Sequence, residues 1–138
     1  MYKLRYSKAS PYVRKIILCV HHLGLENKVT IENADTSDPQ DTLYNQNPTG
    51  RIPVLIKQDG TSLYDSRVIM DFLERQSDKF LFPEAGDARD IGLTQAALGE
   101  GLTDSAILWV YAQRYSGDQP VPELWRSRHQ EKLKNGCD

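Results

Sequence analysis

The sequence predicts an α/β domain with a mixed four-stranded sheet and three helices, followed by a segment that is helical only. Two observations carry this prediction. In residues 1–78, short β-rich runs alternate with apolar residues at helical spacing, in the order βαβ and then ββα. From residue 88 onward, after a stretch rich in turn-forming residues, only the helical spacing continues.

The first strand and the first helix follow directly from the start of the chain. Residues 3–6 form a short β-rich run. Ser10 and Pro11 mark a helix entry, since Ser is a favoured N-cap and Pro is tolerated in the first helical turn. Apolar residues then recur at helical spacing over residues 13–23, and Gly24 is placed to end this helix.

A second strand, a polar loop and a hairpin come next. Val29 and Ile31 alternate with polar neighbours as in a strand, while residues 33–47 leave room for only a short helix or a loop. Residues 52–56 form another β-rich run. The turn signal at residues 58–60 then predicts that the chain returns as an antiparallel partner strand.

A third helix and a linker complete the predicted first domain. Apolar residues at helical spacing follow Asp65 and Ser66 and predict a helix that ends near Gln76. Pro and Gly interrupt the pattern over residues 79–87, so this stretch is predicted to be a linker. The predicted domains are therefore residues 1–78 and residues 88–138.

The second segment is predicted to hold one long helix and one shorter helix. Apolar positions support a single helix over residues 88–115, although Gly99 and Gly101 each weaken it by about 1 kcal/mol relative to Ala. A last helix is predicted to begin near Pro122. Since two helices do not close a helical domain by themselves, we expect this domain to be incomplete and its apolar surface to be covered in an oligomer.

The charge balance excludes several classes of partner. The chain has 138 residues with 17 basic against 19 acidic side chains, so its formal net charge is −2. Nucleic acids and anionic membranes are bound by clustered basic fields, whereas the basic residues here are scattered, so we expect neither as a partner. The sequence shows neither a long apolar run nor a signal-peptide pattern, which favours a cytoplasmic protein.

The cysteines and histidines predict no metal site and no disulfide. Cys19 and Cys137 lie far apart in the sequence, and His129 has no partner at metal-ligand spacing. Cys19 stands inside the apolar run of residues 16–20, where a buried, inert thiol is expected.

Three short motifs fall in one order along the chain. They are SPYVRK at residues 10–15, NPTGRIPVL at residues 47–55 and LYDS at residues 63–66. Together they resemble the cytosolic glutathione S-transferase family, most of all bacterial members that carry Ser where other members carry Cys. The resemblance is close over residues 1 to about 80 and looser beyond.

The resemblance implies a fold, an activity and partners. The fold would be a thioredoxin-like glutathione-binding domain followed by part of an all-helical domain, in a chain that is C-terminally short. The activity would be conjugation of glutathione, the co-substrate, to small electrophilic and largely apolar substrates in detoxification, by a homodimer without a metal. The acceptor site would draw on Trp109, Tyr111 and Tyr115.

The resemblance implies that Ser10 acts on the thiol of glutathione. A free thiol has a pKa of about 8.5 and is mostly protonated at neutral pH, whereas the thiolate is the nucleophile. A hydroxyl at a helix N-terminus can donate a hydrogen bond to that anion, next to the positive end of the helix dipole. The alternative is that Ser10 only caps the helix, with Ser7 and Tyr6 as rival hydroxyls.

The other two motifs would hold the tripeptide. The resemblance implies a cis Ile52–Pro53 peptide, which leaves the backbone of Ile52 free to pair with the cysteinyl part of glutathione. Arg51 could reach a carboxylate or be an ordinary surface residue. Ser66 would bind the γ-glutamyl carboxylate and Asp65 its ammonium group, although both are also good helix caps.

Two other functions are weighed against conjugation. Redox chemistry through a CxxC pair is excluded, since Ser10 and Val13 occupy the two positions that the cysteines would need. Reduction of mixed disulfides is disfavoured because Ser10 cannot form the intermediate. A non-catalytic glutathione-binding or dimerisation module of the same fold remains the alternative.

Overall fold

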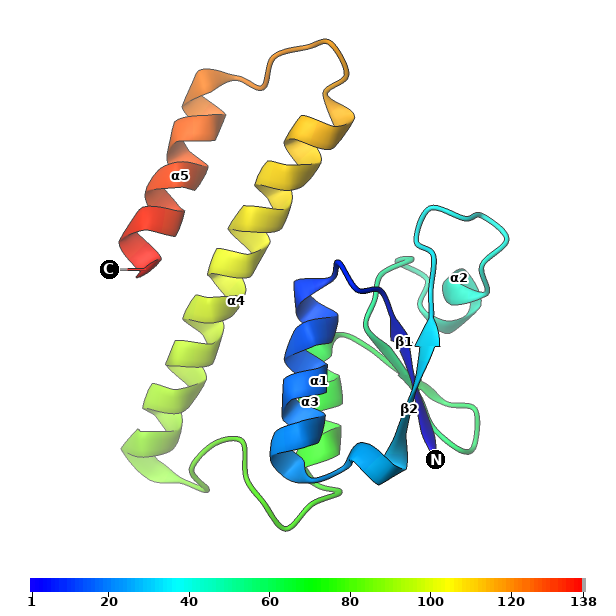
Figure 1. Ribbon diagram of the computed structural model, residues 1–138. Helices are drawn as coiled ribbons and strands as arrows, with labels where there is room; N and C mark the ends of the chain where they lie inside the picture. Colours follow the sequence, from blue (N-terminus) through cyan, green and yellow to red (C-terminus); the bar gives the residue numbers. More distant parts are fainter. Residues whose placement is uncertain (138) are drawn as a thin grey trace. The chain divides into compact units, whose positions relative to one another are not determined.

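The computed structural model describes residues 1–137; Asp138, the last residue of the predicted helical segment, lies outside the described residues. The chain divides into two compact units, Met1–Leu81 and the part from Phe82 onward (Figure 1). Among the described residues, no helix is both long and apolar enough to cross a membrane.

The first unit is built on a four-stranded sheet in the order β2-β1-β3-β4. β1 (Tyr2–Tyr6) pairs in parallel with β2 (Val29–Asn33) and antiparallel with β3 (Val54–Ile56). β3 pairs antiparallel with β4 (Ser62–Leu63). This arrangement confirms the predicted mixed sheet and the order βαβ followed by ββα.

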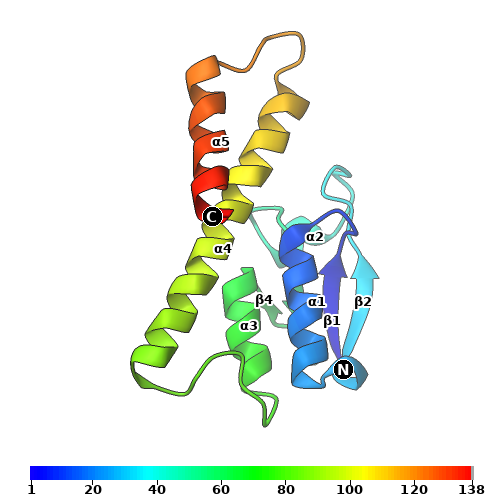
Figure 2. The same ribbon diagram turned by 60° about the vertical axis from the view of Figure 1, so that its left-hand side comes forward.

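Two helices lie side by side against one face of this sheet (Figure 2). They are α1 (Pro11–Leu23) and α3 (Ser66–Glu74). A short 3-10 helix, η1 (Glu26–Lys28), leads into β2, and α2 (Leu43–Gln46) is the only turn of α-helix in the polar loop between β2 and β3. The sequence left room for a short helix or a loop in this stretch, and the structure has a loop with one short helix.

The apolar spacing of α1 and α3 produces the core of the first unit. Each helix directs one stripe of buried side chains toward the sheet, and the strands contribute residues from the facing side. The nine members of this cluster are Leu4, Val13, Ile16, Val20, Leu23, Leu25, Leu55, Ile69 and Leu73. Cys19 is buried on α1, as predicted, and burial raises the pKa of its thiol.

The second unit consists of two helices, α4 (Gly86–Tyr115) and α5 (Glu123–Cys137). The predicted long helix is confirmed. The two helices pack closely at Gly136. The Leu102 side chain of α4 occupies the space that a side chain at this position would need. His129 of α5 is buried and stacks on Trp125, with ring centroids 3.9 Å apart.

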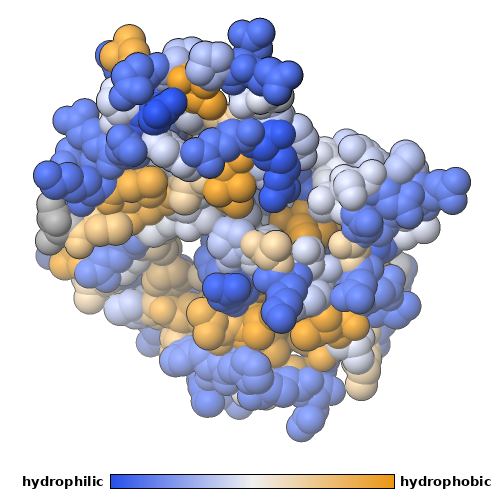
Figure 3. Space-filling model, turned by 45° about the horizontal axis from the view of Figure 1, so that its top comes forward, coloured by the Kyte–Doolittle hydropathy of each residue, from blue (hydrophilic) through white to orange (hydrophobic). Residues whose placement is uncertain are grey.

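Many apolar side chains of α4 remain at the surface. Figure 3 shows apolar groups interspersed with hydrophilic ones over the face that it draws. On α4 the exposed large apolar residues are Ile91, Leu93, Leu98, Leu108, Val110, Tyr111 and Tyr115. The helical spacing therefore predicted the helix correctly, whereas the described chain covers only part of its apolar surface.

A buried arginine ties the polar loop to the sheet. Arg5, in the middle of the sheet, is only 3% exposed. Its Nη2 donates to both carboxylate oxygens of Asp41, at 2.6 and 2.9 Å, and to the Asn33 carbonyl at 3.2 Å. Its Nη1 donates to Thr42 Oγ1 and Gln46 Oε1, each at 3.0 Å. The loop is thereby fastened on both sides of the start of α2.

The carboxylate of Asp41 is held in its charged form. A hydrogen bond from the Asp35 N–H is the main cause that lowers the pKa of Asp41, and the Leu43 N–H and the Arg5 guanidinium add to it. Because this pKa lies below its unfolded value, the resulting stabilisation is present above that value and is lost as the pH falls through the folded pKa.

We predict that Asp41→Asn lowers the free energy of unfolding at pH 7 by about 2 kcal/mol, since it removes the nearer of the two carboxylates that pair with the buried Arg5 and leaves only Glu32, whose Oε1 lies 3.7 Å from Arg5 Nη1. Chemical denaturation measures this change. The exposed Asp71–Arg75 pair supplies the control, because Asp71→Asn should cost less than about 0.5 kcal/mol. The difference between Asp41→Asn and wild type should shrink below about pH 4; a difference that stays constant down to pH 2 would contradict the account.

Candidate functional site

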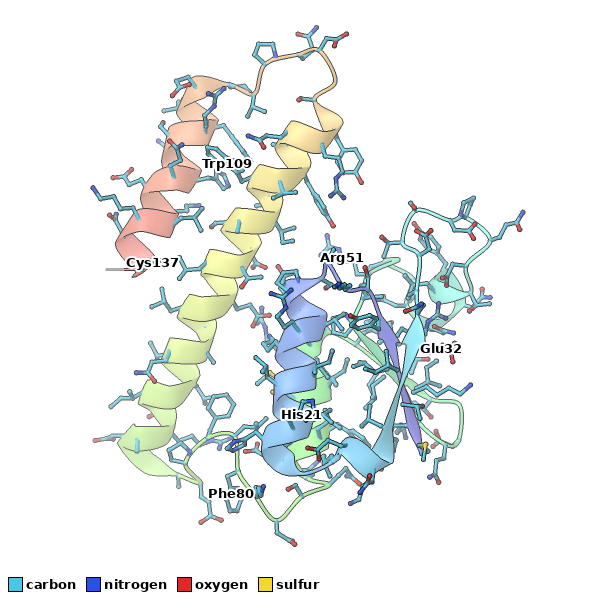
Figure 4. The ribbon with its side chains drawn as sticks, viewed as in Figure 1. His21, Glu32, Arg51, Phe80, Trp109 and Cys137 are labelled. Atoms are coloured by element: carbon cyan, nitrogen blue, oxygen red, sulfur yellow. The ribbon has the colours of Figure 1, made fainter. Side chains whose placement is uncertain are left out.

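The topology brings the three sequence motifs to one edge of the sheet. β1 and β4 both run antiparallel to β3, so they run parallel to each other and end at the same edge. α1 follows β1 and α3 follows β4, so both helices begin at this edge, and β3 starts there as well. Figure 4 shows Arg51 at this end of the first unit and His21, near the end of α1, at the opposite end.

Ser10 is the N-cap of α1, as expected from the sequence. Its backbone is extended, with φ −79° and ψ 118°, and its Oγ accepts a hydrogen bond from the Val13 N–H at 3.3 Å. This bond uses a lone pair of the oxygen and leaves the hydroxyl proton as a donor. Ser10 is half-buried at the positive end of the α1 dipole, so its hydroxyl is suited to donating to an anion.

The rival hydroxyls are placed differently. Tyr6 is the last residue of β1 and packs against the core of the first unit. Ser7 belongs to the turn into α1, where its carbonyl accepts a hydrogen bond from the Ser10 N–H at 3.1 Å. Of the three residues, Ser10 alone is a helix cap.

The second motif forms a tight loop before β3. The Ile52–Pro53 peptide is cis, as the resemblance implied, and Pro53 is buried. Ile52 lies outside the β1–β3 ladder, which ends at the pair of Arg5 and Val54. Arg51 is exposed, and its carbonyl accepts a hydrogen bond from Asn47 Nδ2 at 2.8 Å.

The third motif starts α3. Asp65 is the N-cap, and its carboxylate accepts a hydrogen bond from the Arg67 N–H at 2.9 Å. Ser66 is the first residue of the helix and is only 2% exposed, whereas Asp65 is exposed. The peptide between Tyr64 and Asp65 is also cis. The first N–H groups of α3 have no partner within the helix, which makes this terminus suited to an anionic group.

The aromatic residues expected at an acceptor site fall into two groups on α4. Trp109 lines a shallow hollow within the second unit together with Gln113, Val121, Trp125 and Arg126, and Figure 4 shows it between α4 and α5. Tyr111 and Tyr115 instead pair edge to face, with ring centroids 5.7 Å apart. Among the described residues, no group of three or more potential ligands is placed to hold a metal ion.

Two residues of this region were not singled out from the sequence. Asn47 is 3% exposed and organises the loop before Pro53, and Arg5 holds the segment that precedes it. Asn47 opens the NPTGRIPVL motif, and a polar residue at the start of a turn was the available signal. For Arg5 the signal was weaker: a charged residue between two hydrophobic neighbours in a strand.

Comparison with known proteins relates this geometry to a family. Residues 9–76 match the family model described as the glutathione S-transferase N-terminal domain. A solved structure of a glutathione transferase family member from Pseudomonas fluorescens Pf-5, with bound glutathione, is 34% identical and has a TM-score of 0.90. That match covers 99% of this chain and 68% of the other. The chain belongs to the glutathione transferase family.

Two curated proteins are also similar in sequence to this chain. An uncharacterised GST-like protein of Escherichia coli K12, YibF, is 30% identical over 99% of the chain and 66% of its own length. The isoprene-epoxide glutathione S-transferase of Rhodococcus sp. AD45 is 31% identical over 67% of the chain. The chain spans only 66% and 33% of the lengths of these two proteins.

Gly50 is required by the loop for two separate reasons. Its φ is +63°, in the left-handed region, and a Cβ at this position would lie 2.6 Å from the ring of Tyr44. Gly60, in the hairpin turn, has φ +84° but no atom within 4 Å of such a Cβ. A substitution at Gly60 would therefore test backbone strain alone, whereas one at Gly50 would also test the contact with Tyr44.

We predict that Gly50→Ala lowers the free energy of unfolding by about 2 kcal/mol, whereas Gly60→Ala lowers it by about 1 kcal/mol, since the exposed Tyr44 ring can move aside at a small cost. The difference arises because Tyr44 must move only in the first variant. Thermal or chemical unfolding of both variants measures it. Equal costs would mean that the Tyr44 ring moves aside without a measurable loss of stability and that only the backbone conformation matters at Gly50.

Proposed function

We propose that this chain binds glutathione at the sheet edge where α1 and α3 begin, and that the glutathione thiolate attacks a small, electrophilic, largely apolar substrate. One observation carries the proposal: two helix N-termini with hydroxyl-bearing residues, Ser10 and Ser66, begin at the same edge as the cis Ile52–Pro53 loop. Glutathione has an ionisable thiol and a γ-glutamyl carboxylate, so two sites for anions match two of its groups.

The Ser10 hydroxyl is proposed to stabilise the thiolate. Its lone pair caps α1 through Val13, and its proton donates to the sulfur, so capping and thiolate binding use different parts of one group. The partial positive charge at the start of α1 adds to this effect. The thiolate then attacks the electrophilic carbon, a C–S bond forms, and the leaving group or opened epoxide oxygen takes the displaced electron pair.

The remaining groups are proposed to hold the tripeptide. The backbone of Ile52 pairs with the cysteinyl part, and Pro53 keeps this backbone turned outward from the strand. Ser66 binds the γ-glutamyl carboxylate, Asp65 binds the ammonium group, and Arg51 reaches a carboxylate of the ligand. The bound glutathione in the Pseudomonas fluorescens relative supports glutathione as co-substrate.

The wider setting is part of the same proposal. Residues 1–78 would be the glutathione-binding domain, residues 79–87 a linker and residues 88–138 part of a helical domain that contributes to the acceptor site. The protein would act in detoxification as a cytoplasmic homodimer. The epoxide-conjugating relative from Rhodococcus supports a small electrophile as substrate, and a chain that binds glutathione without turnover would be a non-catalytic module instead.

We predict that Ser10→Ala lowers kcat for conjugation of a generic aromatic halide about 100-fold and changes the Kd of glutathione far less, because the sulfur is the one part of glutathione that the hydroxyl is proposed to contact. The pKa of the bound thiol, read from thiolate absorbance against pH, should rise. Retained turnover in Ser10→Ala, with loss of turnover in Ser7→Ala or Tyr6→Phe, would assign the role to another hydroxyl.

Ser66→Ala and Asp65→Ala are expected to weaken glutathione binding instead. Each removes a charge-assisted hydrogen bond to the γ-glutamyl group, which is worth about 1.5–3 kcal/mol, or about ten- to a hundredfold in Kd. Isothermal titration calorimetry measures this loss. Ser77→Ala is the control, since Ser77 Oγ bonds the Leu23 carbonyl at the far end of α1. Unchanged affinity in both site variants would remove this pair from the site.

A further inference from the structure

We propose that Asn47 is a positioning residue that aims the Ile52 N–H at glutathione; this inference rests on the proposed function. Asn47 makes no contact with the reacting sulfur in this scheme. Its effect is transmitted through the peptide bond that joins Arg51 to Ile52.

The buried side chain of Asn47 forms hydrogen bonds to two other residues of the loop before β3. It is 3% exposed, and its Nδ2 donates to the Arg51 carbonyl at 2.8 Å. Its Oδ1 accepts from the Thr49 N–H at 3.0 Å and from Thr49 Oγ1 at 2.8 Å. Since both ends of the amide are engaged, the side chain is held in one orientation.

The bond to Arg51 fixes the direction of the Ile52 N–H. The Arg51 carbonyl and the Ile52 N–H belong to the same peptide group, which is planar. A donor that holds the carbonyl oxygen therefore also fixes the plane in which the N–H lies. This N–H is one of the two backbone groups proposed to pair with the cysteinyl part of glutathione, so Asn47 sets the geometry of that pairing.

Asn47 is itself anchored to the sheet. Its N–H donates to the Leu43 carbonyl at 2.8 Å, and Leu43 is 1% exposed. Arg5 holds α2 on both sides through Thr42 and Gln46, each at 3.0 Å. Asp41 bonds both Arg5 and the Leu43 N–H, so hydrogen bonds connect the middle of β1 through Leu43 and Asn47 to the Arg51–Ile52 peptide.

A residue with this role changes affinity rather than the chemical step. Without the bond to Arg51, the peptide samples orientations that do not pair with the ligand, and binding must select the correct one. The environment of the sulfur at α1 stays the same. A purely structural role predicts a different result: loss of stability, with an affinity loss no greater than that of any equally destabilised variant.

The test compares Asn47→Asp with Thr49→Val and Ser77→Ala in the full 138-residue chain. Asn47→Asp keeps the acceptor for Thr49 but replaces the donor to the Arg51 carbonyl. Thr49→Val removes only the hydroxyl bond on the other side of Asn47. Ser77→Ala removes a side-chain hydrogen bond at the far end of the domain.

We expect Asn47→Asp to raise the Kd of glutathione about tenfold, with kcat at saturating glutathione and the pKa of the bound thiol changing far less. Ser77→Ala should change Kd by less than about twofold, and Thr49→Val, which keeps the bond from the Thr49 N–H to Asn47, should raise Kd less than Asn47→Asp does. Without ligand, the NMR amide signal of Ile52 should shift and its hydrogen exchange should quicken in Asn47→Asp, and neither should happen in Ser77→Ala.

Three outcomes overturn specific statements. If wild type binds glutathione and Asn47→Asp binds it equally well, the positioning role is wrong and the proposed function stands. If the controls lose as much affinity as Asn47→Asp for the same loss of stability, the role is only structural and the inference is wrong. If wild type binds no glutathione, the proposed function fails and this inference fails with it.

Discussion

The packing of α1 and α3 against a single face of the sheet is the constraint on which the first unit depends. Both helices must bury one apolar stripe, and each directly follows a strand of the same direction. Their first turns, whose N–H groups have no partner within the helix itself, therefore lie at the same edge of the sheet. The packing of apolar side chains does not itself recognise a ligand. It does place the polar first turns of both helices at one edge, where a ligand can be bound.

The sequence predicted the elements well because their signals are local. A cap, a helical period and a turn-forming glycine act within a few residues, so α1 could be bounded at Ser10 and Gly24 without knowledge of the fold. The roles of Arg5 and Asn47 could not be predicted in this way. The partners of Arg5 lie 28 to 41 residues away in the sequence, and which polar side chain becomes buried depends on the packing of the whole loop.

The candidate site residues also differ in whether their surroundings could be predicted from the sequence. Ser10 and Asp65 could be placed at helix caps from their residue types and positions, whereas the cis Ile52–Pro53 peptide was implied only by the resemblance to the family. The different settings of Trp109 and Tyr111 could not be predicted, because helical spacing gives the angle around α4 but not what faces each side. For the same reason the apolar surface of α4 could be counted from the sequence but not assigned to a neighbour.

If Ser10 stabilises the glutathione thiolate as proposed, the hydrogen bond from the Val13 N–H limits which amino acids at position 10 would both cap α1 and bind the thiolate. Asp and Asn are equally good caps, yet Asp would set a negative charge beside an incoming anion. Cys keeps a proton, but its sulfur is a weak acceptor and would cap the helix poorly. Thr and Asn also combine an acceptor with a donor, but Thr adds a methyl group and Asn a larger amide at the proposed ligand site. Divergence at this position is therefore expected to be slower than at caps that serve only their helix.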